Sequence, residues 1–324
     1  MSEPAKKPIT LIDYHPPSGD IRQEVLDGLA QPQKRLSPKW FYDEEGSRLF
    51  DQITRLPEYY PTRTELGILH THIAEMAGMI GSCVAIVEFG AGSSVKIRIL
   101  LDILETPAAF IPVDISGEHL LDAARQLAMD YPDLEILPVC ADFTQPFDLP
   151  VPVAAVNRNL VFFPGSTIGN FDLEQARQLL KVMAIEAGAG GGLLIGVDLK
   201  KDPATLESAY NDDAGVTADF NLNLLVRLNR EIGADFDLGQ FTHRAIYSED
   251  KGRIEMHLVS EKDQSVNIDG QLIEFLAGEH ILTECSHKYE LQEFADLAGE
   301  AGFNIRKVWT DPERMFSVQY LELG

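Results

Sequence analysis

Five apolar segments that alternate with helical patterns constrain the fold of this chain more than any other feature. The apolar segments are residues 84–90, 108–115, 135–143, 159–166 and 191–199. Apolar side chains recur at helical spacing in the intervening segments 95–104, 117–130 and 173–188. Strands that are apolar throughout and are separated by helices form a parallel sheet covered on both faces. The alternation therefore predicts a doubly wound α/β sheet.

The end of the chain adds two further strands to this sheet. A helical pattern at 291–302 is followed by strand-like segments at 304–311 and 316–323, which a short PERM turn joins as an antiparallel pair. This ending resembles the seven-stranded, Rossmann-like methyltransferase sheet, in which the last strand runs antiparallel to the others. We expect that fold class here.

Two segments lie outside this sheet and predict a second domain. Residues 1–63 precede it, and residues 200–289 interrupt it after the fifth strand. The second segment contains a helical pattern and alternating strand-like stretches, and a loop of such length without structure would be unusual. We expect a methyltransferase domain of residues 64–199 and 290–324, and an α+β substrate domain of residues 1–63 and 200–289 over the carboxyl edge of the sheet.

Composition narrows the possible partners and compartment. The net charge of −24 argues against nucleic acid as a partner, because phosphate binding needs clustered lysine and arginine. No apolar run is long enough for a membrane helix, and the first twenty residues resemble no secretory signal. Three cysteines without a CxxC pair, and histidines without HExxH spacing, predict no disulfide framework and no metal. We expect a cytoplasmic protein that acts as a monomer.

The ends of the first three strands carry residues suited to a nucleoside. Gly90 and Gly92 follow the first strand and let the backbone approach a ligand closely. Asp114 ends the second strand and could accept hydrogen bonds from both ribose hydroxyls. Asp142 and Phe143 end the third, and offer an acceptor for an adenine amino group beside an aromatic face.

A nicotinamide dinucleotide is the rival ligand for these strand ends. Its fingerprint GxGxxG needs a third glycine to present the helix N-terminus to pyrophosphate, and that position is Val95. Acids at the ends of both following strands fit a nucleoside without pyrophosphate. The pattern favours S-adenosylmethionine as the methyl donor, although Asp114 could instead serve only to start the next helix.

Further motifs resemble one family along nearly the whole chain. They are PKWFYDEEGSRLFDQITRLPEYYPTRTE (38–65), FFPGSTIGN (162–170), AYNDDAGVTADFN (209–221), RIEMHL (253–258) and LTECS (282–286). Together they are similar to the L-histidine Nα-methyltransferases of ergothioneine biosynthesis. The resemblance implies three methyl transfers from S-adenosylmethionine to the α-amino group of L-histidine, which gives hercynine.

The resemblance also implies which residues form the site. Matching motifs place the donor at Phe50, Gly90, Lys96, Asp114, Asp142 and Phe143. They place the amino acid at Tyr59, Gly165, Asn170, Tyr210, Thr217, Met256, Glu284 and Ser286. Tyr42 and Asn170 would act on the reacting amine. These matches fall in both expected domains, so the resemblance implies a substrate between them.

The residue types suit an amino acid with an imidazole ring. Asn170 and Tyr210 are neutral donors for a carboxylate, Glu284 can accept an imidazole N–H, and Ser286 can serve either ring nitrogen. The free α-amine has a pKa of about 7.7–8.0, so no strong base is obligatory. Tyr42 and Asn170 are therefore interpreted as groups that orient the amine.

Purely structural roles for several of these residues stay open at this point. Asn170 could cap the helix that follows, Glu284 and Ser286 could be solvated side chains, Met256 could be core, and Tyr59 an interface aromatic. Two other functions also remain: an N-methyltransferase for a tryptophan-like amino acid, and a non-catalytic acidic binding module on the same fold.

Overall fold

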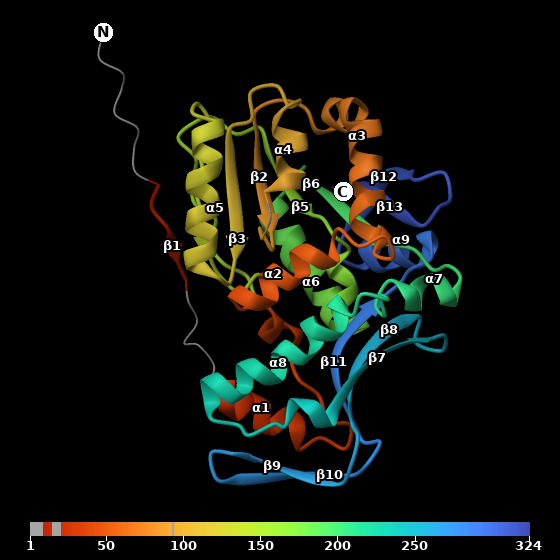
Figure 1. The fold of residues 1–324 in the computed structure, drawn as a ribbon. Coiled ribbons are helices and arrows are strands. Elements are labelled where there is room, and N and C mark those ends of the chain that lie inside the picture. The colour runs from red at the N-terminus through yellow and green to blue at the C-terminus, as the bar shows by residue number, and fades with distance from the viewer. Residues whose placement is uncertain (1–8, 15–20, 93) are drawn as a thin grey trace.

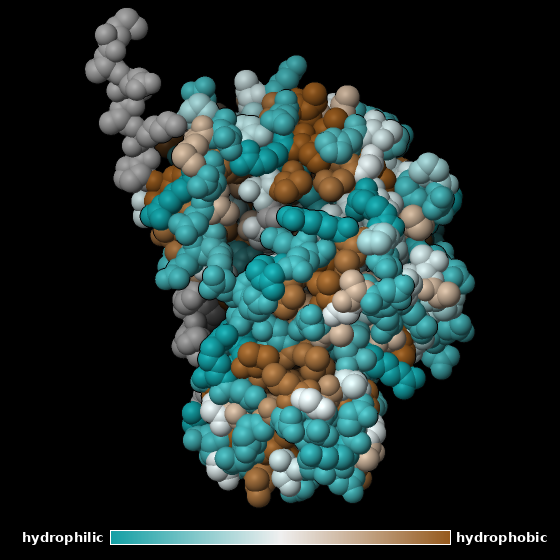
Figure 2. Space-filling model, in the orientation of Figure 1, coloured by the Kyte–Doolittle hydropathy of each residue, from teal (hydrophilic) through white to brown (hydrophobic). Residues whose placement is uncertain are grey.

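The computed structural model describes residues 9–14, 21–92 and 94–324. A large sheet with helices on both faces forms the upper part of Figure 1, and a smaller layer of helices and hairpins lies below its strand ends. Hydrophilic residues cover most of the face shown in Figure 2, as the strongly acidic composition leads one to expect. Among the described residues, no helix is both long and apolar enough to cross a membrane.

The large sheet has the predicted mixed α/β architecture. Its strands follow the order β1-β4-β3-β2-β5-β6-β13-β12. β13 runs antiparallel to both β6 and β12, and the other described pairs are parallel. The bounds in that order are Ile12–Asp13, Val139–Cys140, Ala109–Asp114, Val84–Phe89, Arg158–Phe163, Gly192–Asp198, Phe316–Leu323 and Phe303–Thr310. Chain order reverses on either side of β2, which is where ligands of open α/β sheets bind.

The two faces of the sheet bury alternate residues of each strand. Val84 and Ile86 of β2 face one cluster, and Ala85 and Val87 face the other. The first cluster is covered by α3 (Tyr60–Ile80), α4 (Val95–Leu101) and α5 (Gly117–Asp130). The second is covered by α6 (Leu173–Ala187) and α9 (Leu291–Glu300). Burial on both faces explains why these strands are apolar throughout.

Two details of the sheet differ from the prediction. The segment 135–143 forms only the short strand β4, because Pro138 has no N–H to donate to the ladder and Ile136 is left as an isolated bridge to Phe110. An eighth strand, β1, pairs parallel to β4 through Ile12 and Asp13, although these residues lie in the segment assigned to the second domain.

A third buried cluster unites the segments that lie outside the large sheet. Its residues come from 25–60 and 206–281. The helical elements here are α1 (Ile21–Leu29), η1 (Pro38–Phe41), α2 (Glu44–Ile53), α7 (Pro203–Ser208), α8 (Val216–Ile232) and η3 (Leu238–Gln240). The strands are β7 (Phe241–Ser248), β8 (Arg253–Ser260), β9 (Gln264–Ile268), β10 (Gln271–Phe275) and β11 (His280–His287). The two-domain division stays a proposal, and its boundary after residue 63 falls inside α3.

The helical pattern at 205–233 is two helices, because polar side chains between them bond to the backbone. The carboxylate of Asp212 accepts hydrogen bonds from the N–H groups of Val216 and Thr217, both at 2.8 Å, and so starts α8. Strands β11, β8 and β7 then form an antiparallel sheet in that order. β11 reaches back to η2 (Thr167–Asn170) at the edge of the large sheet, which joins the two parts of the molecule.

Candidate active site

The turn after β2 leaves open backbone at the switch point of the sheet. Gly90 has φ +70°, and its N–H donates to the carbonyl of Val113 at 2.9 Å. The nearest atom to a Cβ placed on Gly90 would belong to Phe143, at 3.8 Å. The Phe143 ring lies against Phe89 and Phe163, with centroids 5.5 and 6.0 Å away. The turn thus offers a glycine backbone beside a fixed aromatic ring.

Two carboxylates stand at the ends of β3 and β4. Burial raises the pKa of Asp114, while the backbone N–H groups of Ser116 and Ile115 oppose that rise. Asp114 accepts from the N–H of Ser116 at 2.8 Å, and Ser116 is itself the cap residue of α5, so Asp114 does not cap that helix. A carboxylate has about four acceptor positions, so this bond leaves room for ribose hydroxyls. Asp142 accepts from the N–H and the hydroxyl of Thr144, at 3.0 and 2.6 Å.

Lys96 is held at this edge by a glutamate that the sequence analysis did not single out. The Lys96 Nζ lies 2.5 Å from Oε2 of Glu65, whose side chain is only 1% exposed. The N–H of Gly165 (φ +83°) donates to both oxygens of Glu65, at 2.9 and 3.0 Å. A Cβ on Gly196 would come within 2.1 Å of Glu65 Oε1, so glycine in β6 makes room for the carboxylate. Glu65 therefore positions Lys96 and Gly165 together.

Aromatic rings from four segments form one wall of the candidate site. Tyr42 lies 5.7 Å from Phe50 and 5.9 Å from Phe220, measured between centroids. Phe50 contacts Tyr59 at 6.3 Å, and Tyr59 contacts Tyr210 at 6.1 Å. The structure thus brings together Tyr42, Phe50, Tyr59 and Tyr210, which are spread over almost 170 residues of sequence. Phe220 completes the wall and was not among the predicted site residues.

Glu284 is a half-buried carboxylate beside Met256. The two residues are paired across β11 and β8, next to a bulge between Leu282 and Glu284. Burial raises the pKa of Glu284 to about 7, with Lys288 opposing the rise. The Glu284 carboxylate makes no hydrogen bond to any residue that the structure describes. The residue is half-buried, so a fully exposed surface carboxylate is the wrong interpretation. Met256 is 2% exposed and belongs to the buried cluster, while also flanking Glu284.

Ser286 and Tyr210 meet at the bottom of the same region. The Tyr210 hydroxyl donates to Ser286 Oγ at 2.9 Å. The buried Lys288 donates to both oxygens, at 3.1 Å to Tyr210 and 2.8 Å to Ser286. Ser286 is 4% exposed, so the interpretation as a solvated hydroxyl is also wrong.

Asn170 does not cap the helix that follows it. The cap of α6 is Asp172, which accepts from the N–H of Gln175 at 2.9 Å in a capping box. Asn170 ends η2, and its side-chain amide bonds to none of the described residues. Thr217 is 2% exposed at the start of α8, where its N–H donates to Asp212. The contacts of Thr217 are structural, and they do not by themselves place it against a ligand.

Tyr42 connects the two groups of residues. The residue is 41% exposed, and its ring packs against Phe50 and Phe220. Burial, and after it the Glu284 carboxylate, raise the pKa of Tyr42 well above its ordinary value. The Asp114 carboxylate also raises the pKa of Tyr42, by less than Glu284 does. The charges of Glu284 and Asp114 therefore both act on the Tyr42 hydroxyl.

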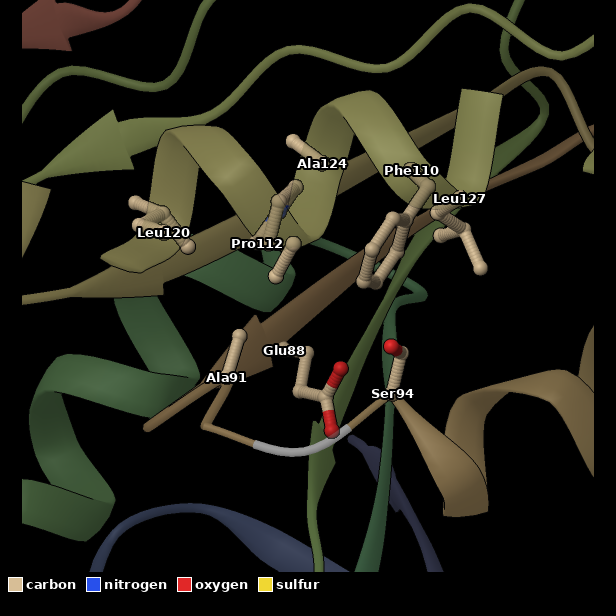
Figure 3. Close-up of a pocket in the computed structure, with 9 residues that line it drawn as sticks. Glu88, Ala91, Ser94, Phe110, Pro112, Leu120, Ala124 and Leu127 are labelled. Carbon is tan, nitrogen blue, oxygen red and sulfur yellow. The ribbon is translucent and has the colours of Figure 1, made fainter. Parts of the chain in front are cut away.

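A small cavity lies beneath the glycine turn, and it contains a further buried acid. Figure 3 shows Glu88 between the turn that carries Ala91 and Ser94 and the side chains of Phe110 and Pro112. Burial raises the pKa of Glu88 to about 8, and the nearby Lys96 ammonium opposes this. The cavity is lined mostly by apolar side chains of β3 and α5 and does not open on the predicted amino-acid residues.

Among the described residues, no group of three or more histidine, cysteine, aspartate or glutamate side chains could hold a metal ion. Lys201, in the loop after β6, lies 2.6 Å from the buried Asp198 and 2.6 Å from the hydroxyl of Tyr60. Asp198 and Lys288 form the rest of that network and, like Glu65, had no signal in their local sequence.

The chain is similar to proteins of known activity over nearly its whole length. A family model described as a histidine-specific, S-adenosylmethionine-dependent methyltransferase matches residues 21–323. The histidine N-alpha-methyltransferase of Mycolicibacterium smegmatis is 44% identical, covering 92% of this chain and 93% of that protein. That of Mycobacterium tuberculosis is 42% identical, covering 90% and 91%. Ergothioneine biosynthesis protein 1 of Neurospora crassa is 33% identical, covering 86% of this chain and 32% of that protein.

Proposed function

The chain belongs to the S-adenosylmethionine-dependent, histidine-specific methyltransferases, and we propose that the cleft between Asp114 and Glu284 is where it works. Its reaction is the methylation of the α-amino group of L-histidine, carried through three transfers to hercynine in ergothioneine biosynthesis. The family match does not favour the tryptophan-like alternative or a non-catalytic binding module. A cytoplasmic location and a monomeric state stay predictions from the sequence.

One observation carries the assignment of the cleft. The pKa of Tyr42 is raised by Glu284, on the β11 side, and also by Asp114, at the end of β3. The resemblance assigns Glu284 to the binding of the amino acid and Asp114 to the binding of the donor. A methyl transfer needs both substrates in one space with the reacting atoms aligned, and Tyr42 borders that space.

The strand-end residues fit a nucleoside donor. Gly90 exposes backbone beside the Phe143 ring, which suits a flat base, and Asp114 is an enclosed carboxylate for ribose hydroxyls. Asp142 is the acceptor expected for an exocyclic amine, and Lys96 is held in place by Glu65. When bound, S-adenosylmethionine supplies a methyl group on a sulfonium, which the amine of histidine displaces.

The β11 residues fit the imidazole ring. In this proposal Glu284 accepts one ring N–H, Ser286 binds the other ring nitrogen, and Met256 forms a pliable apolar wall. A buried site that hydrogen-bonds a polar group of its substrate strongly rejects analogues that lack the group. Selection of histidine then follows from hydrogen bonds to the ring.

The carboxylate and the amine of histidine are assigned to the remaining residues. The uncommitted amide of Asn170 is a neutral donor for the carboxylate. Tyr210, whose hydroxyl hydrogen goes to Ser286, borders the same end of the cleft. Gly165 and Tyr59 shape the same end of the cleft. Thr217 is assigned to the histidine site by the resemblance alone. Tyr42 keeps its proton throughout the neutral range because its pKa is raised, so we give it an orienting role and not that of a base.

Repeated methylation makes the amine larger and, at the last step, permanently charged. Each of the first two transfers must be followed by loss of a proton, and the α-amine pKa of about 8 allows this near neutral pH. The wall of Tyr42, Phe50, Tyr59 and Phe220 offers apolar contact and aromatic faces for the final cation. Such a wall tolerates the loss of amine hydrogen-bond donors.

The proposal is tested by the product. Incubation of the protein with L-histidine and excess S-adenosylmethionine should give a species three methyl groups heavier, with fragmentation placing all three on the α-nitrogen. Tryptophan, offered at the same concentration, should be a much poorer substrate. Methyl groups on a ring nitrogen, or preferred turnover of tryptophan, would contradict the assignment.

A further inference from the structure

Lys288 is a fully buried cation directly behind the residues assigned to the imidazole ring. Its side chain is 1% exposed, and Nζ lies 2.7 Å from Oδ2 of Asp198. The same Nζ lies 2.8 Å from Ser286 Oγ and 3.1 Å from the hydroxyl of Tyr210. An ammonium has three donors and no acceptor, so these three contacts use all its hydrogen-bonding capacity.

The hydrogen-bond directions around Ser286 follow from this arrangement. Lys288 can only donate, so both hydroxyl oxygens accept from it. Ser286 and Tyr210 also share one bond, in which Tyr210 donates to Ser286 at 2.9 Å. The pair has two hydroxyl hydrogens, and their mutual bond uses one of them. The other, on Ser286, has to point away from Lys288 and Tyr210.

We infer that Lys288, anchored by Asp198, is a positioning residue that makes Ser286 a hydrogen-bond donor to the bound amino acid. Ser286 then faces a lone pair of the substrate, while Glu284, two residues earlier on β11, faces an N–H. A donor beside an acceptor matches a neutral imidazole, which has one nitrogen of each kind. Without Lys288 the serine hydroxyl could turn to accept, and the pair would lose this selectivity. The inference rests on the proposed function.

Lys288 also acts on the charge of Glu284. Its ammonium opposes the rise that burial causes in the Glu284 pKa. The other titratable groups that face Glu284 are the hydroxyls of Tyr42, Tyr59 and Tyr210 and the thiol of Cys285. Lys288 is the cation among these groups, so its removal should let Glu284 take up a proton at a higher pH.

The test compares Lys288→Met with Lys201→Met. Lys201 also contacts Asp198, at 2.6 Å, but its second partner is Tyr60 and it touches neither Ser286 nor Tyr210. Both variants remove one buried charge from the same carboxylate. Lys288→Met should weaken the binding of L-histidine about tenfold or more at pH 7, as expected when a hydrogen bond to a polar group of the substrate is lost. Lys201→Met should leave histidine affinity within about twofold.

The pH dependence gives a readout that general loosening of the fold would not produce. In Lys288→Met the acidic limb of kcat/KM for histidine should move to higher pH, and S-adenosylmethionine affinity by calorimetry should stay unchanged. If Lys288→Met does not fold, the double variant Asp198→Asn, Lys288→Met removes the buried pair together, which proteins tolerate better than removal of one partner. The double variant should show the same loss of histidine affinity, and the acidic limb of its kcat/KM profile should lie at the same higher pH.

Two results would overturn the inference. Equal losses in Lys288→Met and Lys201→Met would mean that the network only supports the fold. An acidic limb that stays in place in the folded variant would mean that Lys288 does not act on the ring-binding pair. Neither result bears on the proposed function, which the product formed by the unaltered protein decides separately.

Discussion

Glu284→Gln should make the protein more stable and at the same time a poorer histidine enzyme. The substitution keeps the shape of the side chain and removes its charge. Burial raises the pKa of Glu284 from 4.5 to about 7, which means that the ionised carboxylate is disfavoured in the folded protein. A residue that destabilises the fold yet lies beside the candidate ring site is a strong candidate for a binding role.

The gain in stability can be given a size and a pH window. A pKa of about 7 in place of 4.5 corresponds to at most about 3 kcal/mol, at 1.36 kcal/mol per pH unit. Between these two values the folded state binds more protons than the unfolded state, so the free energy of unfolding falls as pH rises. The advantage of Glu284→Gln should therefore be absent near pH 4, grow up to about pH 7 and stay constant above it.

The loss in binding follows from the change in hydrogen-bond strength. A hydrogen bond to a charged group contributes about 1.5–3 kcal/mol and a neutral one about 0.5–1.5 kcal/mol. Replacing the carboxylate by an amide should thus lower kcat/KM for histidine about tenfold. The indole ring of tryptophan has a single nitrogen, and we do not expect tryptophan binding to depend on this carboxylate. The ratio of kcat/KM for histidine to kcat/KM for tryptophan should therefore fall by a similar factor.

The assay pairs denaturant unfolding at pH 5 and pH 8 with kcat/KM for both amino acids. Glu88→Gln is the matched control, because burial raises the pKa of Glu88 to about 8 in the cavity beneath the glycine turn. It should also stabilise the protein at high pH, but leave the histidine-to-tryptophan ratio unchanged. The reasoning is refuted if Glu284→Gln leaves that ratio constant, or if the variant is no more stable than the unaltered protein at pH 8.

Two further predictions concern the donor and the amine. Asp114→Asn keeps an acceptor for the Ser116 N–H but removes the charge offered to the ribose, so S-adenosylmethionine affinity by calorimetry should fall about tenfold; unchanged affinity would leave Asp114 only its hydrogen bond with Ser116. Asn170→Ala should lower kcat/KM for histidine about tenfold without lowering the melting temperature. The control Asp172→Ala removes the cap of α6 and should cost about 1 kcal/mol of stability. A lower melting temperature with unchanged kcat/KM in Asn170→Ala would make Asn170 structural.

The sheet and its donor edge could be predicted because they depend on local pattern. Alternation of apolar strands and helices specifies a parallel sheet, and the ends of such strands meet at one edge whatever the rest of the chain does. Gly90, Asp114 and Asp142 were predicted at the donor site for that reason. The residues proposed to bind histidine were predicted only through resemblance, because the local sequence around Glu284 and Ser286 carries no recognisable signal.

Tertiary structure decided which polar residues are buried and what they touch. Nothing near Glu65 in the sequence indicates that its carboxylate will meet the N–H of Gly165, a hundred residues further on. Asp198 ends β6 and Lys201 follows in the next loop, and both lie in one buried network with Lys288 from beyond β11. The physical reason is that the pKa and hydrogen-bond directions of such groups depend on burial and on partners from distant segments. Those partners are set only when β6, α3 and β11 pack together, and the periodicity of each segment carries no information about them.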